Sequence, residues 1–238
     1  MGDKYRSHIY GEGEKNTVWR FGGPPNYDKV NKLFEEGRTN VWPEGSREER
    51  VQNLVKTWEM EIVHKVNPQD YKTVNAETFT HNVNGRRPMN LQEVMRVGSY
   101  NAFLQTSLPE KLRAYNPDTE SRESSNEEFL TTFPRGFALE IIEVYSSEAP
   151  VVSYKFRHWS FMEGPFMGHP PTGEMVEFYG LGLVGLDENN LIDRMEFFYD
   201  PSIVIAALIG GSNKAAGGES AESTPQASSL GCPFFNKN

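Results

Sequence analysis

Residues 137–200 read FALEIIEVYSSEAPVVSYKFRHWSFMEGPFMGHPPTGEMVEFYGLGLVGLDENNLIDRMEFFYD. Four segments of this stretch are rich in aromatic and β-branched residues, and turn-forming runs such as SSEAP and DENN separate them. The four predicted strands are Phe137–Ser146, Val151–Met162, Met175–Leu186 and Leu191–Asp200. Because consecutive strands joined by short connections pair antiparallel, this stretch predicts an antiparallel sheet.

Two helix starts precede the strands. Ser46 and Glu49 match the capping-box pattern, and Asn90 with Glu93 forms a second such pair. After the first pair, apolar residues recur at helical spacing at Val51, Leu54, Val55, Trp58 and Ile62. Helices followed by a run of strands indicate the α+β class. We therefore expect a curved antiparallel sheet packed around N-terminal helices, with an apolar pocket between them.

Composition divides the chain into three predicted parts. Residues 1–45 are rich in Gly, Pro and aromatic residues, and we expect this arm to pack on the main domain because aromatic side chains avoid water. Residues 46–209 form the α+β domain, in which the polar segment 106–131 predicts a long loop. Residues 210–238 are dominated by Gly, Ser and Ala and predict a disordered tail.

The charge and hydropathy of the chain exclude two classes of partner. Lys and Arg number 24 against 33 Asp and Glu, so the formal net charge is −9, and an acidic chain lacks the basic face that nucleic acids require. No run approaches the roughly 18 apolar residues of a membrane span, and no apolar leader is visible. We therefore expect a cytoplasmic protein with neither a nucleic-acid partner nor a membrane span.

Cys232 is the single cysteine of the chain. One cysteine forms neither an internal disulfide nor a cysteine-rich metal site, which fits a reducing compartment. Two interpretations of Cys232 stay open: an exposed inert thiol, or a haem-contact or acylation site. The His, Asp and Glu residues show no metal-ligand spacing, and the chain has no phosphate loop or dinucleotide fingerprint. No metal and no cofactor are predicted.

His158 is the first candidate for chemistry. The period of two places Tyr154, Phe156 and His158 on one face of the second strand, which we expect to line the interior. There His158 is either a core histidine satisfied by a neighbour, or an acid, base or hydrogen-bond donor toward a bound molecule. Tyr154 and Phe156 are predicted ligand contacts, and so is Trp58 of the first long helix.

Asp200 ends the last predicted strand, on the same face as Phe198. A carboxylate between an apolar strand and an apolar helix can be desolvated, which raises its pKa toward that of a base. On this interpretation Asp200 and His158 form a catalytic pair, and Phe198 contacts the ligand. The alternative is structural: Asp200 precedes Pro201 and can cap the helix that follows.

Glu177 and Tyr179 share a face of the third predicted strand. They are predicted as ligand contacts in the pocket, and the alternative for Glu177 is an ion pair with Arg157 across the sheet. His169 lies in the Pro- and Gly-rich loop before this strand, where we expect it to be exposed.

A family resemblance covers nearly the whole chain. The segment GPFMGHPPTGEMVEFYGLGLVGLDENNLIDRMEFFYDP (164–201) resembles the C-terminal half of SnoaL-like polyketide cyclases, which belong to the nuclear-transport-factor-2-like (NTF2-like) superfamily. Other segments, such as FLQTSLPEKLRAYNP and TTFPRGFALE, look like the plant pathogen-related proteins that carry this domain. The resemblance implies an NTF2-like cone with a deep apolar pocket. In the cyclases, an aspartate at the place of Asp200 acts as acid and base on the polyketide.

Three functions stay open at this point. The first is a soluble protein that binds a small apolar metabolite in plant defence or specialised metabolism, as a non-catalytic accessory to biosynthetic enzymes. The second is a cofactor-free cyclase, isomerase or dehydratase that uses Asp200 with His158. The third is a protein-interaction module that forms a homodimer through its sheet face.

Overall fold

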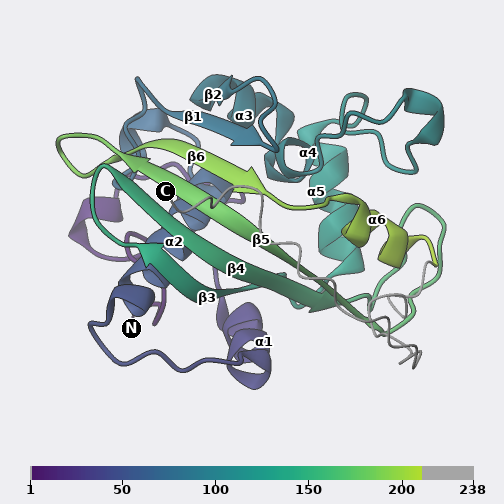
Figure 1. Ribbon diagram of the computed structural model, residues 1–238, viewed down its shortest axis with the longest axis horizontal. Helices are drawn as coiled ribbons and strands as arrows, with labels where there is room; N and C mark the ends of the chain where they lie inside the picture. The colour runs from purple at the N-terminus through teal and green to yellow at the C-terminus, as the bar shows by residue number, and fades with distance from the viewer. Residues whose placement is uncertain (1, 211–238) are drawn as a thin grey trace, which may run out of the picture.

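The computed structural model describes residues 2–210, so Cys232 and the predicted tail beyond Gly210 lie outside the described residues. The helices are α1 (Asp28–Gly37), α2 (Arg47–His64), α3 (Leu91–Val97), α4 (Ser99–Phe103), α5 (Arg122–Thr132) and α6 (Ser202–Leu208). The strands are β1 (Thr80–Val83), β2 (Met89–Asn90), β3 (Ala138–Ser146), β4 (Val151–Phe161), β5 (Met175–Leu186) and β6 (Ile192–Phe198). The predicted α+β class is confirmed (Figure 1).

The strands form one six-stranded sheet in the order β2-β1-β6-β5-β4-β3. Strands β3 to β6 are the four predicted strands, and each pairs antiparallel with the next. The prediction of a wholly antiparallel sheet is wrong at β1, which runs parallel to β6 with Thr80 opposite Arg194. No hairpin joins β1 and β6, because residues 84–191 lie between them in the chain. A short turn therefore does not force the two strands to run antiparallel.

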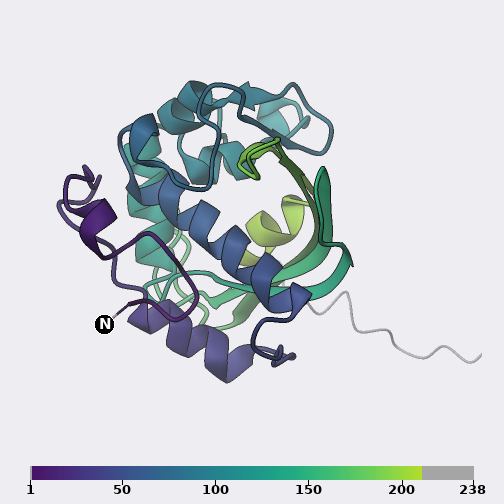
Figure 2. The ribbon, with the colours of Figure 1, turned by 90° about the vertical axis from the view of Figure 1, so that its left-hand side faces the viewer.

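Helix α2 lies across the concave face of the sheet, which curves around it (Figure 2). Ser46 begins this helix as predicted, since its side chain accepts a hydrogen bond from the Glu49 backbone N at 3.2 Å. The core between helix and sheet is largely aromatic and aliphatic, with Val55, Trp58 and Ile62 of α2 buried. Helix α2 is therefore the element that faces the interior side chains of the strands.

The N-terminal arm packs on the domain, and two of its contacts matter most here. In the first, Phe34 of α1 joins a buried apolar cluster with Trp159 on the convex face of β4. In the second, Glu14 reaches the end of α2, where Lys65 Nζ lies 2.9 Å from Glu14 Oε2 and 2.9 Å from Glu61 Oε1. The boundaries proposed at residues 45 and 209 stay predictions.

The prediction of a loop through residues 106–131 is wrong in its second half. Helix α5 begins after Ser121, whose side chain and that of Ser124 form a reciprocal capping box. The helix buries Phe129 and Thr132 but is otherwise polar, and so few apolar residues leave no periodic pattern in the sequence. The sequence of α5 therefore does not distinguish it from a loop, and only its packing in the structure does.

Candidate functional site

The concave face of β4 carries Tyr154, Phe156 and His158, as the period of two predicts. Tyr154 lies opposite Gly182 of β5, and Phe156 lies opposite Gly180. A Cβ atom at Gly182 would lie 2.3 Å from Tyr154 Cζ, and one at Gly180 would lie 2.5 Å from Phe156 Cζ. Only glycine therefore allows both rings to lie across β5, where they form part of the inner wall.

His158 is half-buried and surrounded by aromatic rings. It stacks on Phe178 with ring centroids 5.5 Å apart, and it contacts Phe137 and Phe156 at 5.7 Å each. Burial lowers the pKa of His158 to about 3, and the charge of Lys56 acts in the same direction. The ring is therefore neutral at pH 7, and its Nδ1 has no hydrogen-bond partner within residues 2–210.

Trp58 of α2 is buried at the other end of the same aromatic interior. It stacks on His81 of β1 at 6.3 Å and contacts Phe197 of β6 at 5.8 Å. Burial lowers the pKa of His81 to about 4, so this ring is neutral as well. In the described part of the chain, the indole Nε1 of Trp58 and both ring nitrogens of His81 lack hydrogen-bond partners.

Polar atoms without partners are rare in protein interiors, and each one costs about 1–3 kcal/mol. Tyr154 Oη is another, buried and unpartnered within the described residues. Together with His158, Trp58 and His81 it gives one aromatic surface with several unsatisfied donors and acceptors. Such a surface offers hydrogen bonds to water or to a bound molecule.

Glu59 of α2 carries the acidic group of this interior. It is half-buried, and its carboxylate has no hydrogen-bond or ion-pair partner among residues 2–210. Burial raises the pKa of Glu59, against the opposing charges of Arg6 and Lys56. After burial itself, the charge of Glu59 contributes to the raised pKa of Tyr154 and of Tyr100 on α4. The carboxylate thus lies within electrostatic range of two phenolic hydroxyls.

Lys56 lies one turn before Glu59 and is 1% exposed. Its Nζ lies 3.1 Å from the ring centroid of Phe34 and 4.4 Å from that of Tyr5, and it has no hydrogen-bond partner in the described chain. Burial lowers the pKa of Lys56 well below its ordinary value, while the two ring faces favour the ammonium form through cation–π contact. Lys56, Glu59, Tyr154 and His158 are called the unpaired set below.

Asp200 does not form the predicted catalytic pair with His158. It is exposed, and its Oδ1 accepts hydrogen bonds from the backbone N of Ser202 at 2.9 Å and from its Oγ at 2.6 Å. This arrangement at the start of α6 is the structural alternative. The neighbouring Tyr199 turns inward in its place and contacts Phe178 at 5.0 Å. Alternation along the strand therefore leaves Asp200 outside.

The predicted ligand contacts Glu177, Tyr179 and Phe198 lie on the convex face, so their placement in the pocket is wrong. Their side chains alternate with inward ones along β5 and β6. Glu177 Oε2 accepts a hydrogen bond from Arg157 Nε at 2.7 Å, which confirms the alternative of an ion pair across the sheet. Tyr179 is 46% exposed and Phe198 is 39% exposed.

A cleft of about 320 Å³ lies beside the aromatic interior, between the β1–β2 hairpin and α4. Its lining residues are Asn82, Val83, Arg86, Arg87, Met89, Ala102 and Gln105. Ala102 precedes Phe103, whose ring contacts both Trp58 and His81. The floor of the cleft therefore adjoins the aromatic interior.

His169 is exposed, as expected. Residues 2–210 contain no group of three or more His, Cys, Asp or Glu side chains that is placed to hold a metal ion. Within the same range, no helix combines the length and the apolar character needed to cross a membrane.

The comparison with known proteins gives one close relative. A "Pathogen-related protein" of Hordeum vulgare is 56% identical over 209 residues, which cover 87% of this chain and 89% of the barley protein. The chain belongs to the pathogen-related protein family. No protein-family model matches it.

The matching solved structures are much more distant. A protein provisionally named a SnoaL-like polyketide cyclase, from Jannaschia sp. CCS1, is 18% identical with a TM-score of 0.37, over 77% of this chain and 90% of that one. An epoxide hydrolase of M. tuberculosis is 10% identical with a TM-score of 0.31, over 58% of this chain and 74% of the other.

Sequence reasoning missed Glu59 and Lys56 in this member of the pathogen-related family. Both flank the apolar face of α2, where charged residues normally face solvent. Tyr5 and Phe34 of the arm cover Lys56, and Glu59 is half-buried. The sequence does indicate the inner wall of β5, because Gly180 and Gly182 alternate with leucine there, and glycine within a strand often marks a close approach of another group. For His81 the sequence holds no such signal.

Proposed function

We propose that this protein binds a small, largely apolar metabolite against the aromatic concave face of its sheet. The observation that carries the proposal comes from the unpaired set: Tyr154 Oη and His158 Nδ1 have no hydrogen-bond partner in the described chain, and both rings lie beside Phe156. Aromatic walls with a few polar groups are typical of small-molecule sites. The ligand we propose is flat and apolar, and it carries an oxygen-containing group that forms a hydrogen bond with Tyr154, His158 or Glu59.

The biological setting of this proposal is plant defence or specialised metabolism. The name of the barley relative supports it. A protein that binds such a metabolite without changing it would act in the cytoplasm as an accessory to the enzymes that make or use the compound.

The first test uses protein from its source tissue. Native mass spectrometry is expected to show a co-purifying small molecule, and thermal shift across a panel of terpenoids and phenolics is expected to find ligands. Glu59→Gln should weaken binding about tenfold, as loss of one buried hydrogen bond to a charged group does. Glu188→Gln, in an exposed turn, is the matched control and should bind normally. The proposal would be contradicted if no small molecule co-purified and no compound of the panel changed the melting temperature.

A cofactor-free cyclase, isomerase or dehydratase is the second candidate, with Glu59 in place of Asp200 as the base. The raised pKa of Glu59 favours it, because a desolvated carboxylate near phenolic donors suits proton abstraction beside a carbonyl. His158, neutral at pH 7, would serve as a hydrogen-bonding group. Exchange of substrate C–H for deuterium, lost in Glu59→Gln, is the diagnostic measurement. Ligand binding without exchange favours the accessory role.

A homodimer through the convex face is the third candidate, and it is compatible with either of the others. Tyr179, Leu181 and Phe198 are 46%, 45% and 39% exposed, and Leu181 pairs with Phe198 across β5 and β6. Contiguous exposed apolar side chains of this kind mark interaction surfaces. Analytical ultracentrifugation should show a dimer that Leu181→Lys dissociates; a monomer at all concentrations would remove this candidate.

A further inference from the structure

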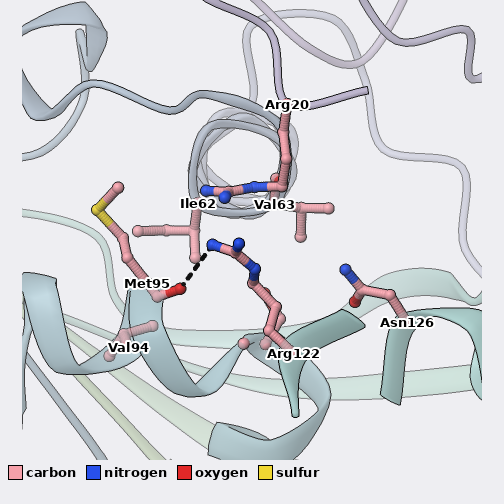
Figure 3. A pocket seen from close by; sticks show the side chains of 9 residues that line it. Arg20, Ile62, Val63, Val94, Met95, Arg122 and Asn126 are labelled. Carbon is pink, nitrogen blue, oxygen red and sulfur yellow. Dashed lines mark hydrogen bonds between the residues drawn. The ribbon is translucent and has the colours of Figure 1, made fainter. Parts of the chain in front are cut away.

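Arg20 and Arg122 both line a small cavity near the C-terminal end of α2, where Ile62 and Val63 of that helix also line it (Figure 3). Arg20 belongs to the N-terminal arm, and Arg122 is the first residue of α5. The cavity has a volume of about 10 Å³, which is room for about one water molecule or one oxygen of a larger group. Asn126, one turn into α5, also lines it. Three donor side chains thus converge on one small space.

Backbone carbonyl groups hold both guanidinium groups in place. Arg20 donates from Nε to Val63 O at 3.0 Å and from a terminal nitrogen to Lys65 O at 3.1 Å. Arg122 donates from one terminal nitrogen to Met95 O at 3.0 Å, and its Nε and other terminal nitrogen donate to Glu123 Oε1 at 2.9 and 2.5 Å. A guanidinium group has five N–H bonds in a rigid fork, so these contacts orient both groups and leave N–H donors free for the cavity.

The position of Arg122 depends on the break between α3 and α4. Gly98, at that break, has a φ of 86°, and a Cβ atom there would lie 2.6 Å from Arg122 Cγ. Glycine therefore meets two demands at once, a left-handed backbone and the close passage of the arginine stem. The helix is therefore interrupted between α3 and α4, at the point where Arg122 enters the cavity.

The charge around the cavity is unbalanced. Burial lowers the pKa of Arg20, and the positive charge of Arg122 lowers it further. In the described part of the chain, the acid paired with either group is Glu123, whose side chain is 70% exposed and contacts Arg122 alone. Two half-buried cations against one solvated carboxylate is an arrangement that an anion would stabilise.

We propose that Arg20 and Arg122 form an anion site that binds one oxygen edge of a small oxyanion, with Asn126 as a neutral donor. Phosphate, sulfate and carboxylate groups share the chemistry that a pair of guanidinium forks recognises. Bound there, the anion would tie the arm to α5. The site is separate from the metabolite site proposed above and does not depend on it.

Thermal unfolding in sodium phosphate, sodium sulfate and sodium acetate, each against sodium chloride at equal ionic strength, tests the site. At saturation we expect at least one oxyanion to raise the midpoint by on the order of 3 °C. The ranking of the three distinguishes a tetrahedral oxyanion from a carboxylate. Equal midpoints in all four salts would overturn the proposal.

Variants then locate the effect. Arg20→Gln and Arg122→Gln should each abolish the oxyanion-specific shift, whatever their midpoints in chloride. Arg96→Gln, on the exposed face of α3, is the control and should keep it. A shift retained in both cavity variants would show a general salt effect and refute the site. If one cavity variant does not fold, the other decides, and calorimetric titration of the wild type with inorganic phosphate gives an independent reading.

Discussion

Two groups of charged residues along helix α2 differ in one respect. At its C-terminal end, Lys65 contacts Glu14 and Glu61, and the Glu61 carboxylate also accepts hydrogen bonds from the backbone N atoms of Lys72 and Thr73 at 2.8 and 3.0 Å. We call Glu14, Glu61 and Lys65 the paired set. In the unpaired set, Lys56 Nζ is buried without a hydrogen-bond partner among the described residues, and the pKa of Glu59 is raised by burial with no hydrogen bond to oppose it.

The difference separates a satisfied ion network from the groups on which the binding proposal rests. Burial of a charge is tolerated when hydrogen bonds replace its water, and the paired set meets that condition. The unpaired set does not, so it lowers the stability of the fold. Under the binding proposal, a ligand supplies the hydrogen bonds that these groups lack.

The sharpest test of the comparison begins with Lys65→Met. Removing one partner from a buried, satisfied ion network leaves the Glu14 and Glu61 carboxylates uncompensated, which should cost about 3–5 kcal/mol of unfolding free energy. Urea unfolding followed by far-UV circular dichroism measures the loss. A loss below about 1 kcal/mol would mean that the network is not structural.

Acid should destabilise the protein through His81, whose two ring nitrogens lack hydrogen-bond partners in the described part of the chain. The pKa of His81 in the folded protein is about 4, below the ordinary 6.5, so the unfolded chain binds more protons between these values. The stability that a neutral His81 contributes is therefore present above pH 6.5 and is lost as the pH falls toward 4, by about 3 kcal/mol in all.

The measurement for His81 is the free energy of unfolding at pH 7 and pH 4.5, for wild type and His81→Phe. The variant should lose less stability on acidification, whatever its stability at pH 7. Glu59, with a raised pKa, has the opposite sign and is stabilised as the pH falls, so Glu59→Gln should steepen the acid loss. An unchanged slope in His81→Phe would contradict the assignment.

Gly182→Ala tests whether the interior wall depends on the rings that cross β5. The new methyl group would overlap Tyr154 and should cost about 1–3 kcal/mol. Gly23→Ala, where nothing lies within 4 Å, is the control and should change little. Adding Tyr154→Val to the first variant should recover part of the loss, which a general backbone effect would not allow.

The smallest effect is expected from Lys56→Met, the counterpart of Lys65→Met. Loss of the cation–π contacts opposes relief from burying an unpaired amine, so the free energy of unfolding should stay within about 1 kcal/mol of wild type. The same urea titration compares the two variants. A loss as large as that of Lys65→Met would erase the distinction between the two sets.

The sheet and α2 were predictable because their patterns are local. Alternation along β4 correctly placed Tyr154, Phe156 and His158 on the concave face, and the cap at Ser46 correctly began the helix. The parallel pairing of β1 with β6 was not predictable, since residues 84–191 separate the two strands and no turn constrains their direction.

The candidate site was only partly predictable. Alternation alone cannot say which of two mixed faces is concave, and on β6 the outward face holds Phe198 while the inward one holds Phe197. That ambiguity led to the wrong choice of Asp200. Lys56 is buried by Tyr5 and Phe34 of the distant arm, and no local pattern of α2 encodes that contact.

The contacts of the arm bear on how short this chain can be made. Trimming it to residues 46–209 would keep every strand and the helices from α2 onward, and would remove α1. It would also remove the Glu14 carboxylate from Lys65 and the rings of Tyr5 and Phe34 from Lys56. The minimal folding unit is therefore longer than the region that carries the recognisable pattern, and recombinant work on the pocket should retain residue 3 onward.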